Sequence, residues 1–195
     1  MWWYGGESKR TIHQPQAMAF FHPRMANVVW AVVVTGPFKI PQNIFILWMA
    51  ILRKLSTGDK VWIQGEAKIC VLCDTQSLET HEHLFFQCPY AQRCLAVLCR
   101  EVCFQGPSLC WQEGVQRMSA CWKGHHLWNA AQRATLVSVV YHIWKARNCK
   151  RFQSLCMPPE ATAVGVLEQV KMRMTSTELS VSLQFVALFR IGKFP

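Results

Sequence analysis

The chain of 195 residues suits one domain or one and a half, and it is long enough to enclose a hydrophobic core. Its composition is 51% hydrophobic, with nine Trp and eleven Phe, which argues against intrinsic disorder. The net charge of +10, from 21 basic and 11 acidic residues, favours polyanionic partners such as RNA, DNA or an anionic surface. A solvated basic surface without such a partner would carry the same charge.

Targeting signals are not visible in the sequence. The apolar runs at 28–34 and 44–52 are much shorter than the roughly 18 residues of a membrane span. The first residues lack the basic start and the sustained apolar stretch of a secretory signal. We therefore expect a soluble intracellular protein, in the nucleus or the cytoplasm and not secreted, with no membrane partner.

The first part of the chain combines an irregular segment with one clear helix. Glycines and prolines interrupt any period in the lead-in, residues 1–36. Within it, residues 28–34 are rich in β-branched side chains and could form a short strand, although a helical or irregular lead is equally open. Apolar side chains at three- and four-residue steps predict a helix over 41–55, through Ile44, Trp48, Ile51, Leu52 and Leu55.

A narrow metal-ligand pattern follows. Cys70 and Cys73 are separated by two residues, His83 follows after nine more, and Cys88 after another four. The first gap lets one turn place both sulfurs on a single ion, and the four residues make a Cys₃His set. Structural zinc sites use four such ligands in a tetrahedron and leave no position open for chemistry. We therefore predict a closed structural Zn²⁺ site.

One ligand has a rival. His81 lies two residues before His83, and positions two apart on a helix point about 200° away from each other, so only one can face the metal. We favour His83 because it is closer to Cys88, and His81 then becomes a solvent-facing or outer-shell residue. The alternative to a metal site is that the cysteines are ordinary buried residues of a chain that holds ten of them.

Short elements are expected to carry the ligands. Residues 61–63 and 69–71 look like extended pieces on either side of Gly65 and predict a β ribbon that carries Cys70 and Cys73. Residues 79–86 would form a brief helix or turn that brings in His83. Pro89 suits the first position of a helix over 89–103, which places Cys88 at the helix start, where the dipole favours a thiolate.

The second half of the chain is predicted to be helical after a break. Residues 106–129 contain several glycines and read as a connector, and 130–195 as a helical C-terminal region. A helix over 130–153 has an apolar stripe, and a third helix over 161–174 runs through Val164, Leu167, Val170 and Met174. The apolar tail from residue 180 could be a strand or a docked extension.

The end of the helix over 130–153 allows two interpretations. Lys145, Arg147, Lys150 and Arg151 could contact phosphates, with Trp144 and Phe152 stacking on bases. Alternatively, Arg147 and Asn148 could close the helix by pairing with carbonyls or a Glu. We favour the structural role for Arg147 and Asn148, because Arg147 continues the apolar stripe, and we keep Lys150 and Arg151 as phosphate-binding candidates.

These motifs together resemble a known family. The series resembles the zinc-binding domain that follows the reverse transcriptase of plant LINE-type (non-LTR) retrotransposons, through residues 38–41, 45–48, 55–60, 70–73, Glu79 and 83–88. Residues 144–148, with Arg151 and Phe152, are similar to the Trp-Lys-x-Arg-Asn segment that often follows that domain. The resemblance implies that Cys70, Cys73, His83 and Cys88 are the metal ligands. It departs at Leu95, where the family usually has Trp.

The expected fold is mainly α with a small zinc-pinned β ribbon (α+β) and a helical C-terminal extension, the zinc-binding domain covering 37–105. We expect no enzyme activity, because the chain has only Asp59 and Asp74 as aspartates and no carboxylate set for a two-metal site. The expected function is a zinc module that binds RNA or DNA with weak sequence selectivity beside a reverse transcriptase domain. The alternative is a structural or protein-interaction fragment, or a degenerate retroelement remnant. Basic residues near the site are the candidates for contacting nucleic acid: Arg53, Lys54, Lys60, Lys68, Arg93, Lys150 and Arg151.

Overall fold

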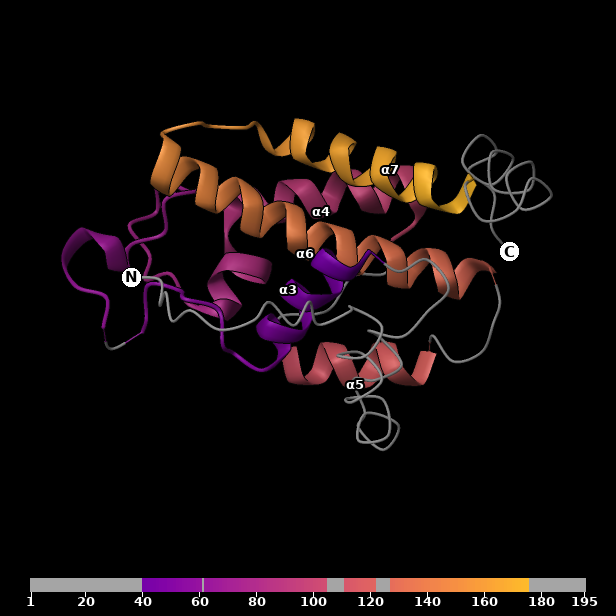
Figure 1. Ribbon diagram of the computed structural model, residues 1–195, viewed down its shortest axis with the longest axis horizontal. Helices are drawn as coiled ribbons and strands as arrows, with labels where there is room; N and C mark the ends of the chain where they lie inside the picture. The colour runs from indigo at the N-terminus through magenta and orange to yellow at the C-terminus, as the bar shows by residue number, and fades with distance from the viewer. Residues whose placement is uncertain (1–39, 61, 105–110, 122–126, 176–195) are drawn as a thin grey trace, which may run out of the picture.

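The computed structural model describes residues 40–60, 62–104, 111–121 and 127–175, which are mainly helical (Figure 1). The helices are α3 (Pro41–Ile51), α4 (Pro89–Val102), α5 (Trp111–Cys121), α6 (Leu127–Gln153) and α7 (Pro159–Thr175), with a 3₁₀ turn η1 (Gly65–Lys68) and a π-helical turn η2 (His83–Gln87). The predicted lead-in over 1–36, including the possible strand at 28–34, and the apolar tail from 180 lie outside the described residues.

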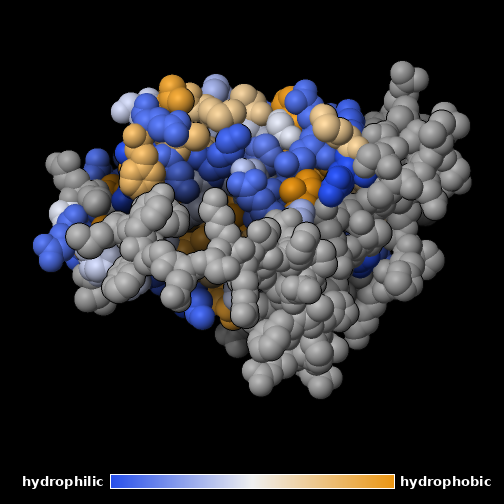
Figure 2. Space-filling model, in the orientation of Figure 1, coloured by the Kyte–Doolittle hydropathy of each residue, from blue (hydrophilic) through white to orange (hydrophobic). Residues whose placement is uncertain are grey.

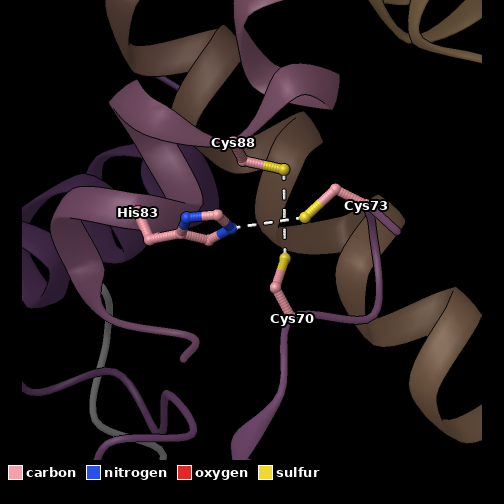
Figure 3. A group of neighbouring side chains, drawn as sticks. All are labelled: Cys70, Cys73, His83 and Cys88. Atoms are coloured by element: carbon pink, nitrogen blue, oxygen red, sulfur yellow. Dashed lines mark hydrogen bonds between the residues drawn. The ribbon is translucent and has the colours of Figure 1, made fainter. Parts of the chain in front are cut away.

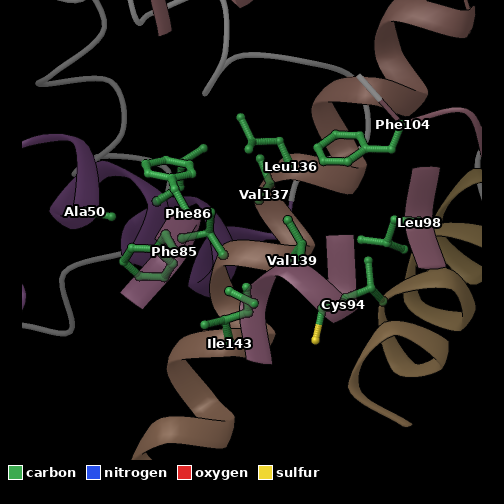
Figure 4. Packing of buried hydrophobic residues seen from close by; sticks show 14 of the residues in the cluster. Ala50, Phe85, Phe86, Cys94, Leu98, Phe104, Leu136, Val137, Val139 and Ile143 are labelled. Atoms are coloured by element: carbon green, nitrogen blue, oxygen red, sulfur yellow. The ribbon is translucent and has the colours of Figure 1, made fainter. Parts of the chain in front are cut away.

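Helix α6 is the centre of the molecule. It contacts α3, α4, α7 and η2, and α7 also lies along α4 (Figure 1). The predicted stripe of α6 is confirmed, because Leu136, Val140 and Ile143 are all buried. These side chains meet residues of α3, η2 and α4 in one cluster (Figure 4). One core therefore runs through both the predicted zinc-binding region, 37–105, and the C-terminal helices.

Two predicted helices are confirmed with small differences. The helix expected at 89–103 is α4, and the one expected at 161–174 is α7. The buried face of α7 differs slightly from the predicted stripe. In α7, Val164 is 48% exposed, whereas Ala163 and Val166 join Val170 and Met174 in the core.

The first helix is shorter than the predicted 41–55. It ends at Ile51 because Arg53 has a φ of 55°, in the left-handed region, and the N–H groups of Arg53 and Lys54 turn back to the carbonyls of Ala50 and Met49. Arg53 and Lys54 therefore lie beyond the helix. In α3 the side chain of Leu47 is fully buried, and the predicted core residue Trp48 is only half-buried.

The β ribbon is a wrong prediction. The described residues contain one isolated antiparallel bridge, Ile69 with Leu78, flanked by hydrogen bonds from Cys70 N–H to Ser77 O (2.9 Å) and from Glu79 N–H to Lys68 O (2.8 Å). The segment before it turns instead of extending, because Gly65 adopts a φ of 64° and begins η1. Cys70 and Cys73 therefore lie on a short loop closed by that bridge.

The predicted connector over 106–129 contains a helix that the sequence interpretation missed. In α5, the side chains of Trp111, Val115 and Met118 are buried. The Trp111 ring packs edge-on against Phe85 and Phe86, with centroids 5.5 and 4.9 Å apart. Helix α5 thus covers the aromatic side of η2.

The surface is mixed. Over the visible part of α6 and α7, hydrophilic side chains are interspersed with apolar ones (Figure 2). Across the described stretches of the chain, none of the helices is both long enough and apolar enough to cross a membrane.

Candidate metal centre

Three short pieces of backbone bring four potential ligands together. Cys70 and Cys73 come from the loop closed by the Ile69–Leu78 bridge, His83 begins η2, and Cys88 is the residue before α4. Their side chains point toward one another (Figure 3). The four candidates taken from the sequence pattern are therefore neighbours in space.

The distances between donor atoms suit one small ion. All four lie within 4.8 Å of one another, with 3.9 Å between the sulfurs of Cys70 and Cys88 and 3.4 Å between Cys73 Sγ and His83 Nε2. A zinc tetrahedron with bonds of about 2.3 Å to sulfur and 2.05 Å to nitrogen has edges of about 3.8 Å between sulfurs and about 3.6 Å between sulfur and nitrogen. The cluster is consistent with zinc in both its donor types and its size.

Local hydrogen bonds hold His83 and Cys88 in place. The Thr80 hydroxyl accepts the N–H of His83 at 2.9 Å, as a capping side chain does at the start of a helical turn. The N–H of Cys88 donates to the carbonyl of His83 at 2.7 Å, closing the π-helical turn between the two ligands. Pro89 then begins α4, as the sequence predicts.

The surroundings of Cys88 and His83 favour the protonation states in which these side chains bind a metal. The hydrogen bond with Cys70 lowers the pKa of Cys88, and the N–H groups of Ala91 and Tyr90 at the start of α4 lower it further, against the effect of burial. Burial lowers the pKa of His83, which keeps its imidazole neutral. The same Cys70–Cys88 contact, together with burial, raises the pKa of Cys70.

His81, the rival ligand, lies elsewhere. It is buried rather than facing solvent, and its Nδ1 is 3.1 Å from the hydroxyl of Thr57. Burial is the main reason that its pKa falls to about 4. His81 is therefore a neutral core histidine, and of its two expected roles, solvent-facing or outer-shell, the first is wrong.

Beside the cluster lies a buried ion network that joins the loop to α6. Arg147 donates from Nε to both carboxylate oxygens of Glu79 at 3.1 Å, and from Nη2 to Oε1 at 2.6 Å. It also donates to the carbonyl of Ser56 at 3.0 Å and to Asn148 Oδ1 at 2.8 Å. The predicted structural role of Arg147, pairing with a Glu and a carbonyl, is confirmed.

Arg151 belongs to the same network. Its Nη2 donates to Glu79 Oε2 at 3.3 Å and to the carbonyl of Ile69 at 3.1 Å, and its side chain is only 11% exposed. Burial lowers the pKa of Arg151, whereas the charges of Glu79 and Cys70 raise it. Arg151 therefore lies beside the metal centre. Its burial and its pairing with Glu79 correct the prediction that it contacts phosphates.

Gly58 allows the loop to close on this network. Its N–H donates to Glu79 Oε1 at 3.1 Å, and a β-carbon at this position would lie 2.8 Å from the carbonyl carbon of Lys68. Only glycine fits so close a contact without displacing backbone. Sequence analysis included Gly58 and Glu79 only in the family resemblance, and it assigned neither residue to this site.

The other basic candidates lie at the surface, fully or in part. Arg53 pairs with Glu82, and Lys60 Nζ donates to the carbonyl of Arg53 at 2.7 Å. The remaining candidates differ in exposure: Lys54, Lys68 and Arg93 are exposed, and Lys60 and Lys150 are half-exposed. Gly58 and Lys68 are in backbone contact, so Lys60 and Lys68 lie on one small loop.

Aromatic side chains that could stack on bases also differ in exposure. Phe85 is 2% exposed and packs under α5, whereas Trp62 is 70% exposed and Phe152 is 74% exposed. Of these three rings, only those of Trp62 and Phe152 could be reached by a base.

Comparison with known proteins gives one match, to the first part of the chain. Residues 12–94 match the sequence model of a family described as zinc-binding in reverse transcriptase. The matched segment contains all four clustered residues and ends within α4, before α5, α6 and α7. No curated protein and no solved structure matches the chain.

Proposed function

We propose that the chain is a non-catalytic zinc module that holds nucleic acid, because residues 12–94 match the family described as zinc-binding in reverse transcriptase. In this proposal it comes from the C-terminal part of a LINE-type reverse transcriptase polyprotein and works inside the cell. The similarity of residues 144–152 to the segment that follows such domains supports the LINE-type origin. The nine described cysteines are free thiols, which suits a reducing compartment such as the nucleus or the cytoplasm.

The donor set supports a structural role for the metal. Four protein side chains surround one point, so a tetrahedral zinc ion there would have no position left for water or substrate. Bound zinc would supply folding free energy and would link the loop at 70–73 to the start of α4.

Exposed positive charge supports a polyanionic partner. Lys60 and Lys68 share one loop, Arg53 contacts Lys60, and Lys54 follows Arg53 in the chain. Among these residues, Arg53 is partly neutralised by Glu82. Such a loop would attract phosphates with a strong dependence on salt and little dependence on sequence.

The observation that carries the proposal furthest is Trp62. It lies on the same loop between Lys60 and Lys68, with 70% of its surface in solvent. An exposed ring between cations is the arrangement with which proteins stack on unpaired bases while contacting the backbone. We therefore assign single-stranded RNA or DNA as the ligand of this loop.

A titration of the zinc-loaded chain with fluorescent single-stranded RNA at several salt concentrations tests the proposal. We expect log Kobs to fall linearly with log salt, and Lys68→Gln to reduce the slope by about 0.7. Trp62→Ala should weaken binding by about 1–3 kcal/mol at every salt concentration. Matched controls are Lys171→Gln, on α7, and Phe45→Ala, an exposed aromatic on α3.

Two results would refute nucleic-acid binding at this loop. One is affinity that is absent or independent of salt for the wild-type chain. The other is a loss in the two control variants as large as in Lys68→Gln and Trp62→Ala.

A second candidate function is docking on a protein, such as a reverse transcriptase domain. The end of α6 and the segment that follows it expose three apolar side chains, Phe152 (74%), Leu155 (58%) and Met157 (40%). This favours a protein contact there. If this function alone is correct, Phe152→Ser with Leu155→Ser should abolish capture of a purified reverse transcriptase domain, and RNA affinity should be absent in the wild type.

A further inference from the structure

The three cysteines of the metal centre differ in how well they are protected. Cys70 and Cys88 are buried, whereas Cys73 is half-exposed. Backbone N–H groups donate to the two buried sulfurs, from Leu72 to Cys70 and from the start of α4 to Cys88. Cys73 is therefore the cysteine of this set whose place on a metal ion is least protected by packing.

A pair of hydroxyl groups lies beside the sulfur of Cys73. Thr75 Oγ1 is 3.0 Å from Cys73 Sγ, and Ser77 Oγ is 2.9 Å from Thr75 Oγ1. The backbone of Ser77 is fixed in turn, because its carbonyl accepts the N–H of Cys70 at 2.9 Å. Between the two hydroxyl residues, Gln76 adopts a φ of 52°, in the left-handed region that residues with a side chain seldom occupy. The loop therefore adopts an unfavourable backbone conformation where the two hydroxyls come into contact.

Metal binding would give this pair of hydroxyls one direction. A thiolate bound to zinc carries no proton, so its sulfur can only accept hydrogen bonds. The Thr75 hydroxyl must then donate to Cys73 Sγ, and its oxygen accepts the proton of the Ser77 hydroxyl. A hydrogen bond to an ionised acceptor is about twice as strong as a neutral one, and the second hydroxyl polarises the first.

We propose that Thr75 is a positioning residue of the metal centre, which holds the thiolate of Cys73 on the ion by donating a hydrogen bond to its sulfur. At Cys70 and Cys88 backbone N–H groups have this role. The hydrogen bond also stabilises the thiolate charge, so it lowers the nucleophilicity of the exposed sulfur. The proposal rests on the zinc-binding part of the proposed function and is independent of nucleic-acid binding.

The zinc dissociation constant of the full-length chain tests the proposal, measured by competition with a chromophoric chelator at constant pH and salt. Replacing residues that support metal ligands from outside the ligand set changes metal affinity by about 10–100-fold. We expect Thr75→Val, which keeps the shape but removes the hydroxyl, to weaken zinc binding by about tenfold or more, and Thr75→Ser to stay within about threefold of wild type. Ser154→Ala removes a hydroxyl from an exposed position after α6 and is the matched control.

Cobalt provides a signature that a change of fold alone would not give. Co²⁺ bound in place of zinc has an absorption band that arises from charge transfer from sulfur to metal, and its energy depends on the hydrogen bonds to the sulfur. Loss of the donated hydrogen bond raises the energy of the sulfur electrons. The band should therefore move to longer wavelength in Thr75→Val and return to its wild-type position in Thr75→Ser.

Alkylation measures the exposed sulfur directly. The zinc-loaded chain is treated with iodoacetamide, and the modified cysteines are identified by peptide mass spectrometry. We expect Cys73 to be alkylated before Cys70 and Cys88, and at a higher rate in Thr75→Val than in Ser154→Ala.

Three results would overturn the proposal. The first is a Thr75→Val variant with the zinc affinity and the cobalt spectrum of Ser154→Ala. The second is a Thr75→Ser variant as weak as Thr75→Val, since the hydroxyl would then not be the group responsible. The third is alkylation of Cys70 or Cys88 before Cys73. A wild-type chain that binds no metal would refute the zinc-binding proposal itself, and this inference with it.

Discussion

Glu79 is the residue on which the contacts around the metal centre converge. Its carboxylate accepts hydrogen bonds from Arg147, from Arg151 and from the N–H of Gly58, and its own N–H and carbonyl bond Lys68 and Asp59. A buried carboxylate of this kind is held by its partners, and without it the buried guanidinium of Arg147 would lose the carboxylate that it pairs with. Glu79 therefore links the loop between the ligands to the longest helix.

We expect Glu79→Gln to lower the free energy of unfolding by about 3–5 kcal/mol, because it removes the carboxylate partner of the buried Arg147 guanidinium. Arg53→Gln, which removes the exposed ion pair with Glu82, should lower it by less than about 1 kcal/mol. Urea unfolding of both variants in excess zinc provides the comparison. Similar losses in the two variants would show that the buried network contributes no more than a surface pair.

At the scale of single residues, the sequence predicted the four metal ligands but not the buried ion network beside them. Cys70, Cys73, His83 and Cys88 are close in the chain, and the spacing of ligand types is itself a geometric signal. The Glu79–Arg147 pair is 68 residues apart, and no local pattern states that the two side chains meet. The position of Arg147 in the apolar stripe of α6 did predict that it is buried.

Among the elements, the loop between α3 and the first ligands departs most from its prediction. β-Branched and aromatic residues at 61–63 and 69–71 favour strands by local preference. The chain instead turns at Gly65, and the contact of Gly58 with Lys68 closes the loop on itself. Tertiary contacts with Glu79 therefore override the local preference, and this could not be foreseen from the segment alone.

Gly58→Ala tests how closely this loop is packed. The added β-carbon would meet the Lys68 backbone, which cannot move without disturbing the bridge to Leu78, so we expect a loss of about 1–3 kcal/mol in unfolding free energy. Gly165→Ala in α7 is the control. There the nearest atom is His142 Cε1 at 3.3 Å, on a side chain, and the gain in helix propensity offsets the contact, so stability should stay within about 1 kcal/mol of wild type. Equal effects in thermal or urea unfolding would argue against a closed loop.

Helix α5 shows an error of a different kind. The glycines and Pro107 around this helix favoured the prediction of a connector. However, Trp111, Val115 and Met118 have helical spacing, and all three are buried. The periodic signal was present over a short window and was outweighed by the flanking breaks. Helices α4, α6 and α7 were predicted because their apolar periods extend over more turns or begin at a proline.

At the scale of the whole molecule, the zinc-binding part and the C-terminal helices share one core. Side chains from α3, η2, α4, α6 and α7 belong to a single hydrophobic cluster, and the Glu79–Arg147 pair crosses the same interface. Sequence boundaries at 105 and 130 therefore separate segments of one packed unit. The covalent order of the chain does not reveal this, because helices remote in sequence pack through general apolar surfaces.

The central claim is that one zinc ion, held by three sulfurs and one imidazole, organises this unit. X-ray absorption at the zinc edge, with metal analysis of the purified chain, tests it most directly. We predict one zinc per chain, with three sulfurs at about 2.3 Å and one nitrogen at about 2.0–2.1 Å. Stoichiometric zinc should be lost in Cys73→Ser and retained in Cys99→Ser, an exposed residue of α4 outside the cluster. Substoichiometric zinc, a shell of only nitrogen and oxygen, or full zinc content in Cys73→Ser would contradict the account.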